Sequence, residues 1–131
     1  MKRYWDTSAI IDALHDARVE ALARLPGQVT RSHTLAEAFS TLTGGRLGFQ
    51  YLAADAADMI KEITSGFEFV ELSATEIQTA LARAQKAGVR GGRVHDWLHA
   101  VAAKKANAAE LLTDNLTDFA GLADGCKIVK P

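Results

Sequence analysis

Five acidic residues of this chain lie where one predicted element gives way to the next, rather than in the middle of helices. They are Asp6, Glu37, Asp96, Asp114 and Asp118. Carboxylates that share a site raise one another's pKa and need a counter-charge. Hard oxygen ligands at this density suit Mg²⁺ or Mn²⁺. A metal held in this way can activate a water molecule and stabilise the leaving oxygen in phosphodiester hydrolysis.

The residues around Asp6 indicate how such a site would be positioned. Met1–Trp5 is predicted to be a short buried strand, and Thr7 or Ser8 is a natural N-cap for the helix that follows. Asp6 therefore lies at the carboxyl end of the first strand, beside a helix N-terminus. Open α/β sheets build their sites at that edge.

Strands and helices alternate along the remainder of the chain. Further strands are expected at Val29–Arg31, Phe67–Leu72, Glu110–Thr113 and Lys127–Val129, with helices at 7–14, 16–25, 34–44, 52–66, 73–88 and 94–106. Thr34–Glu37 and Ser73–Glu76 carry the capping-box pattern that starts a helix. Strands separated by helices imply a central parallel sheet with helices on both faces. The sequence therefore predicts a single three-layer α/β domain over residues 1–131.

Each of these acids also has an ordinary structural explanation. Glu37 taken alone is better explained as a capping-box partner, and Asp114 and Asp118 can equally be turn residues. Asp96 is more informative, because its helix is apolar nearly all round and a buried carboxylate needs a partner. The acids interpreted as surface or capping groups are Asp12, Asp16, Asp55, Asp58 and Asp124.

Composition sets limits on the class of protein. A chain of 131 residues with 48% apolar content buries roughly two-thirds of its unfolded surface. Fifteen basic and sixteen acidic residues give a net charge of −1, so nucleic-acid binding would depend on a local basic patch. The single cysteine, Cys126, excludes an internal disulfide and fits a reducing compartment. Neither a membrane span nor a leader is recognisable, so a cytoplasmic protein is expected.

Four segments together resemble the PIN domain, and most closely the VapC-type toxins of prokaryotic toxin–antitoxin pairs. The segments are Asp6–Ile11, Thr34–Glu37, Gly91–Ala100 and Leu111–Phe119, followed by Lys127–Pro131. No single segment is specific to the family, but their order along a chain of this length is a specific signal. The resemblance implies an endoribonuclease that depends on Mg²⁺ or Mn²⁺, usually a homodimer, held inactive by a small antitoxin.

The resemblance also assigns the acids. By motif, Asp6, Glu37 and Asp96 match three family acids, and Asp118 matches the acid of the Asn-x-x-Asp-Phe run. Asp114 stands where the family often has Arg or another non-acidic residue, so Asp114 and Asp118 remain alternatives for the fourth acid. We favour Asp118, because a helical turn anchored by the phenylalanine after it would bring its carboxylate back toward Asp6 and Asp96.

Neighbouring polar residues are candidates for supporting roles. The hydroxyls of Thr7 and Thr113 are expected to orient carboxylates or water, with Asn115 beside them. His95 and His99 lie one turn apart, which could indicate a metal pair. On a helical wheel, however, both point away from the inner acids, so packing or support of a ligand is preferred.

Three arginines are candidates for contacts with RNA. Arg46, Arg90 and Arg93 flank glycines in predicted loops, where they could hold phosphates or be ordinary surface residues.

Two other functions stay open at this stage: a non-catalytic nucleic-acid-binding regulator of the same fold, and a small-molecule phosphohydrolase. The second is disfavoured because no glycine-rich phosphate loop follows the first strand.

Overall fold

A five-stranded parallel sheet forms the centre of the computed structural model, which describes residues 1–131. The strands are β1 (Arg3–Trp5), β2 (Gln28–Thr30), β3 (Glu68–Phe69), β4 (Glu110–Leu112) and β5 (Lys127–Val129), in the order β3-β2-β1-β4-β5. β1 is central, and its register places Tyr4 opposite Val29 of β2 and Leu111 of β4. The predicted α/β fold with a parallel sheet is confirmed.

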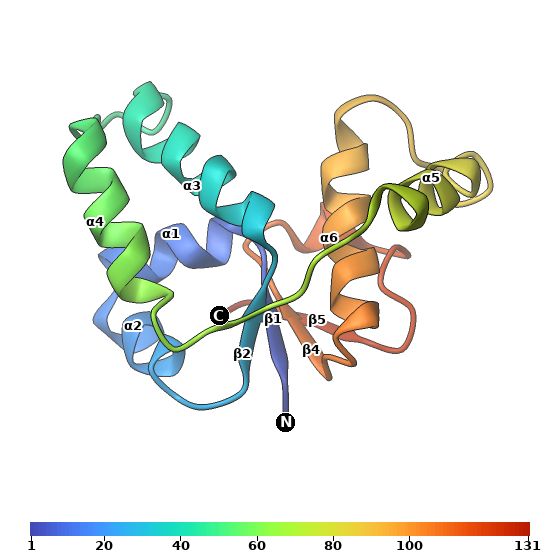
Figure 1. The fold of residues 1–131 in the computed structure, drawn as a ribbon, viewed down its shortest axis with the longest axis horizontal. Coiled ribbons are helices and arrows are strands. Elements are labelled where there is room, and N and C mark those ends of the chain that lie inside the picture. The colour runs from blue at the N-terminus through green and yellow to red at the C-terminus, as the bar shows by residue number, and fades with distance from the viewer.

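Helices cover both faces of this sheet (Figure 1). They are α1 (Thr7–His15), α2 (Ala17–Ala23), α3 (Ser32–Gly44), α4 (Ala53–Ile63), α5 (Ala74–Ala82), α6 (Val94–Lys105) and α7 (Leu116–Phe119), with a 3₁₀ turn at Gly91–Arg93. In Figure 1, α1 to α4 lie on one side of the sheet, and α5 and α6 lie on the other. No helix is both long and apolar enough to cross a membrane.

Alternation along the strands divides the core between the two faces. Trp5 and Leu112 pack with residues of α1 to α4, whereas Tyr4 and Leu111 pack with α6 and with Phe119. Successive strand residues point to opposite faces, so neighbouring side chains of one strand enter different clusters. β1 is therefore buried from both sides, and the residue after it emerges at a fixed place between the two helical layers.

Several helix starts differ from those expected. The first helix is capped by Asp6, whose carboxylate accepts from the Ala9 N–H, and not by Thr7 or Ser8. α3 begins at Ser32, so the expected capping box at Thr34 is wrong. Thr34 is a buried helical residue whose hydroxyl accepts a hydrogen bond from Thr30. The capping box at the start of α5 is confirmed.

The strand expected at Phe67–Leu72 contains only the two residues of β3. β3 lies at the edge of the sheet and pairs only with β2, through the register Val29 to Glu68 and Thr30 to Phe69. Both residues of β3 are exposed. With one neighbour and no buried face, little holds the segment in strand geometry beyond two residues.

Candidate active site

Asp6 lies at the carboxyl end of β1 with both carboxylate oxygens hydrogen bonded. Its Oδ1 accepts from the Ala9 N–H at 2.9 Å and from the Ser8 hydroxyl at 2.7 Å. Its Oδ2 accepts from the Thr113 hydroxyl at 2.6 Å. The residue is 3% exposed, and burial raises the pKa of Asp6 although the hydrogen bonds oppose that rise. The carboxylate is thus fixed in orientation between the ends of β1 and β4.

Glu37 reaches the same edge of the sheet from α3. Its Oε1 accepts from the Thr7 hydroxyl at 3.0 Å and from His99 Nε2 at 2.9 Å. Burial is the largest single influence and would raise the pKa of Glu37, but the bonds from His99 and Thr7 together hold the pKa below its usual value. Glu37 is therefore a positioned carboxylate rather than a solvent-facing capping acid.

His99 connects Glu37 to the core. The imidazole is 3% exposed, and its Nδ1 lies 2.7 Å from the Tyr4 hydroxyl. A carboxylate only accepts hydrogen bonds, so Nε2 of His99 must carry a hydrogen and donate it in the bond to Glu37. Burial raises the pKa of Tyr4, so its hydroxyl stays protonated beside Nδ1. The expectation that His99 points away from the acids is wrong.

Asp96 and Asp118 approach each other from α6 and α7. Burial raises the pKa of Asp96 first, and the negative charge of Asp118 raises it further, with smaller contributions from Asp6 and Glu37. Asp118 is exposed, while the adjacent Phe119 is completely buried and anchors its helical turn, as expected. The charges of Asp6, Glu37 and Asp118 therefore all act on Asp96. The ligand atoms of Asp6, Asp96 and Asp118 do not form a group within 4.8 Å, and of the expected acids only Glu37 belongs to such a group.

Asp114 is directed toward a different acid. Its N–H donates to the Ser8 hydroxyl at 2.9 Å, and its carboxyl group lies against Asp12 of α1. Burial, followed by the hydrogen bond and charge of Asp114, raises the pKa of Asp12 to about 7. Asp12 was expected on the surface. The available signal was its position one turn after Ser8, on the helical face that carries the Ser8 hydroxyl.

Glu37, Asp12 and Asp114 line a cleft of about 950 Å³ between α1, α3 and α6, whereas Asp6, Asp96 and Asp118 are not among its lining residues. Its lining includes Thr7, Asp12, Glu37, His95, Asp114, Asn115 and Arg46. Of the three arginines that are candidates for contacts with RNA, only Arg46 lines the cleft. Arg90 is exposed elsewhere, and the Arg93 guanidinium donates to the carbonyls of Gly88, Asp118 and Ala120. Arg93 thereby ties the loop before α6 to α7.

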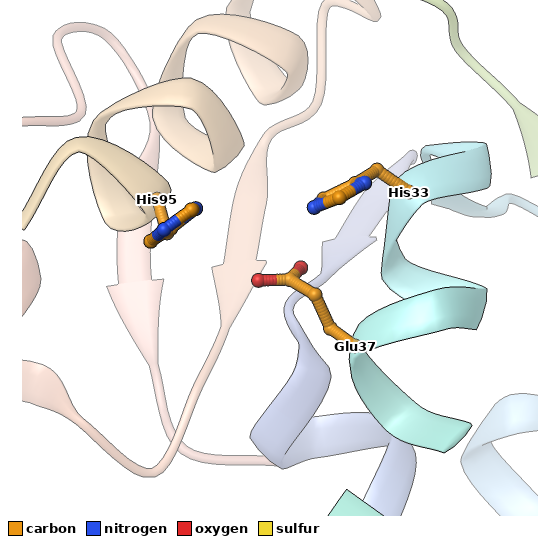
Figure 2. A group of neighbouring side chains, drawn as sticks. All are labelled: His33, Glu37 and His95. Atoms are coloured by element: carbon orange, nitrogen blue, oxygen red, sulfur yellow. The ribbon is translucent and has the colours of Figure 1, made fainter. Parts of the chain in front are cut away.

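Two histidines also face the cleft. His33 of α3 and His95 of α6 have ring nitrogens that lie, with a carboxylate oxygen of Glu37, all within 4.8 Å of one another. Figure 2 shows the three side chains pointing into the same space between the two helices. His33 was not singled out from the sequence, and the expectation that His95 points away from the acids is wrong. His33 and Glu37 are spaced i, i+4, which places them on one helical face.

Comparison with known proteins identifies a family and similar folds. A family model described as the PIN domain matches residues 3–124. The structure is similar to that of PAE2754 from Pyrobaculum aerophilum, with a TM-score of 0.71, 18% identity, and coverage of 98% of this chain and 90% of the other. It is similar also to VapBC-1 from nontypeable Haemophilus influenzae, with a TM-score of 0.67, 22% identity, and coverage of 99% and 98%. No curated protein matches the chain.

Proposed function

Because the chain belongs to the PIN domain family, we propose that it is a metal-dependent endoribonuclease and the toxin of a type II toxin–antitoxin pair. The observation that carries the proposal is the influence of three other acids on Asp96, together with the position of Asp6 at the carboxyl end of β1. The charges of Asp118, Asp6 and Glu37 all act on Asp96, which is half-buried. Four carboxylates in this arrangement repel one another and favour a bound cation.

The donors fit a hard divalent ion. Asp6, Asp96 and Asp118 offer only carboxylate oxygens, which are the ligands preferred by Mg²⁺ and Mn²⁺. When bound, the ion supplies a Lewis acid that neutralises negative charge on the phosphate and makes water a better nucleophile. Asp114 and its neighbour Asp12 line the cleft together with Glu37 and would act on the outer side of the site.

The chain's own residues position the acids. Thr113 holds Asp6 through one hydroxyl bond, and Thr7 and His99 hold Glu37 through two. Both bonds to Glu37 end on Oε1, so Oε2 remains directed toward a ligand or a water molecule. Arg46 borders the cleft with a positive charge that can contact an RNA phosphate.

The toxin assignment rests on two observations. The chain carries the order of motifs that resembles VapC-type toxins, and one similar solved structure is named VapBC-1. We therefore propose a cognate antitoxin as the partner and a homodimer as the assembly, in a cytoplasmic setting.

Cleavage of RNA by purified protein tests the proposal. We expect cleavage with Mg²⁺ or Mn²⁺ that stops when EDTA is added. Asp96→Asn removes one charge at constant volume and should reduce cleavage at least about a hundredfold while also weakening Mn²⁺ binding measured by titration calorimetry. Asp58→Asn, a change to an exposed acid of α4, is the matched control and should retain both properties. Cleavage that survives exhaustive chelation, or a fully active Asp96→Asn enzyme, would refute the mechanism.

A further inference from the structure

His33, Glu37 and His95 differ in chemistry from the acids beside them. Two imidazole nitrogens and one carboxylate oxygen lie within 4.8 Å of one another, contributed by α3 and α6 (Figure 2). Imidazole is a borderline ligand that suits Zn²⁺, Ni²⁺ and Cu²⁺, whereas Mg²⁺ prefers oxygen alone. A set of three protein ligands with an open fourth position is typical of accessible Zn²⁺ sites.

The two imidazoles of this cluster are also free to bind. The other histidines use both ring nitrogens in hydrogen bonds, His15 to the Ile11 carbonyl and Tyr51, and His99 to Tyr4 and Glu37. His33 and His95 make no hydrogen bond and are exposed, so their rings can rotate. Ligands around Zn²⁺ lie about 3.4 Å apart, and rotation of exposed side chains can close the remaining distance.

The helices that carry the cluster are held in place by a neighbouring bond. His99 lies one turn after His95 on α6, and its bond to Glu37 at 2.9 Å links α6 directly to α3. That bond occupies Oε1 of Glu37, as does the bond from Thr7. Oε2 is therefore the oxygen available to a metal, and the two helices are already at a fixed separation before any ion binds.

We propose that His33, Glu37 and His95 form a second metal site that takes Zn²⁺ or a similar transition metal in preference to Mg²⁺. The site lies in the cleft that Asp12 and Asp114 also line, and it shares Glu37 with the proposed acidic site. Zn²⁺ bound there withdraws Glu37 from the acidic site and places a cation in the cleft. Given the proposed nuclease function, Zn²⁺ inhibits cleavage that Mg²⁺ supports.

Calorimetric titration of the full chain with Zn²⁺ tests binding independently of activity. Millimolar Mg²⁺ is present throughout to occupy the acidic site. We expect one Zn²⁺ per chain, with affinity reduced at least about tenfold by His33→Gln and by His95→Gln. His15→Gln removes a histidine outside the cluster and should leave affinity unchanged. Circular dichroism checks that each variant is folded.

Further variants and an activity assay separate this site from the acids. Asp96→Asn should retain Zn²⁺ binding, since Asp96 is not in the cluster. The proposal is overturned if wild type binds no Zn²⁺ in Mg²⁺, if the two histidine variants bind as tightly as His15→Gln, or if Asp96→Asn abolishes binding. Zn²⁺ inhibition, scaled to each variant's own activity without Zn²⁺, should weaken with His33→Gln and His95→Gln. A protein that binds Zn²⁺ as described but never cleaves RNA would refute the nuclease proposal alone.

Discussion

Asp114 and Asp118 are separated by one helical turn and face different neighbours. The charge of Asp118 acts on Asp96, whereas the carboxyl group of Asp114 lies against Asp12. Asp118→Asn should therefore weaken Mn²⁺ binding and RNA cleavage more than Asp114→Asn does. Titration calorimetry and initial cleavage rates, measured on both variants, compare the two acids directly. The reverse order would identify Asp114 as the closer ligand.

The pair of Asp12 and Asp114 predicts a pH dependence of stability in the absence of metal. The pKa of folded Asp12 is raised to about 7, well above the usual range of an aspartate carboxyl group. A raised carboxyl pKa stabilises the folded protein at low pH, and this contribution is lost as pH rises through about 7. Asp12→Asn removes the repulsion, so at pH 8 it should raise the free energy of unfolding by about 1 kcal/mol after solvent screening.

Urea unfolding in EDTA at pH 5 and pH 8 measures this difference. The stability gain of Asp12→Asn over wild type should be larger at pH 8 than at pH 5, since at pH 5 wild-type Asp12 is already protonated. Asp58→Asn is the control for loss of one surface charge and should show a smaller change between the two pH values. Equal effects of the two substitutions would show that Asp12 and Asp114 do not interact.

At the scale of elements, Thr113 joins three segments through one hydroxyl. It follows β4, donates to Asp6 after β1, and accepts from the Asn115 N–H before α7, each bond being shorter than 3.0 Å. The residue is completely buried. Thr113→Val leaves a buried carboxylate and an N–H without this partner, which should lower the free energy of unfolding by about 2 kcal/mol.

Thr113→Ser is the matched variant, because it keeps the hydroxyl and removes only a methyl group. Urea denaturation should place it close to wild type and well above Thr113→Val. Mn²⁺ affinity should follow the same order, since Asp6 loses its fixed orientation only in the valine variant. If valine and serine variants are equally stable, the hydroxyl does not hold the three segments together.

Local sequence patterns correctly predicted the helices that are determined by residues close together in the sequence. The apolar periodicity of 94–106 gave α6, and the Asn115–Phe119 run gave the turn of α7, because Phe119 anchors it in the core. The start of α3 was misplaced because Thr34 bonds to Thr30 of β2, a contact that depends on how the helix leaves its strand. A capping-box pattern cannot distinguish that arrangement from a true helix start.

The roles of His99 and Asp12 depend on partners that are distant in the sequence. A helical wheel gives the faces of α6 but does not show that α3 lies across it, so the bond from His99 to Glu37 was unpredictable. The sequence near Asp12 indicates a surface or capping acid. Its interaction with Asp114 depends on the position of β4 beside α1, which the local sequence does not show. The family motifs made Asp6, Glu37 and Asp96 candidates without this information, because the spacing of a motif reflects the tertiary packing of its family.

At the scale of the whole molecule, the acidic cleft predicts the chemistry of a protein inhibitor. The chain has a net charge of only −1, yet several of its acids gather at one edge of the sheet. Clustered carboxylates attract any cation that enters. We expect the antitoxin to insert an Arg or Lys there, so co-expression with an adjacent short reading frame should give a stable complex with low nuclease activity.

Ribonuclease assays on the purified complex measure this inhibition. Replacing the inserted basic residue of the partner with Gln should restore cleavage while the complex, followed by size-exclusion chromatography, stays assembled through its other contacts. A complex that is fully active before any substitution would argue against occupation of the cleft.

The central position of β1 in the sheet has a consequence for folding during synthesis. β1 leaves the ribosome before the other strands and can pair early with β2, but its other neighbour, β4, is synthesised only after β2 and β3. Thr113, which orients Asp6, lies 107 residues after it in the chain. Domains assemble as their segments emerge, so a nascent chain without β4 and α7 has an incomplete set of acids. Translation products that end before β4 should therefore lack the proposed nuclease activity, which a ribonuclease assay on such products would measure.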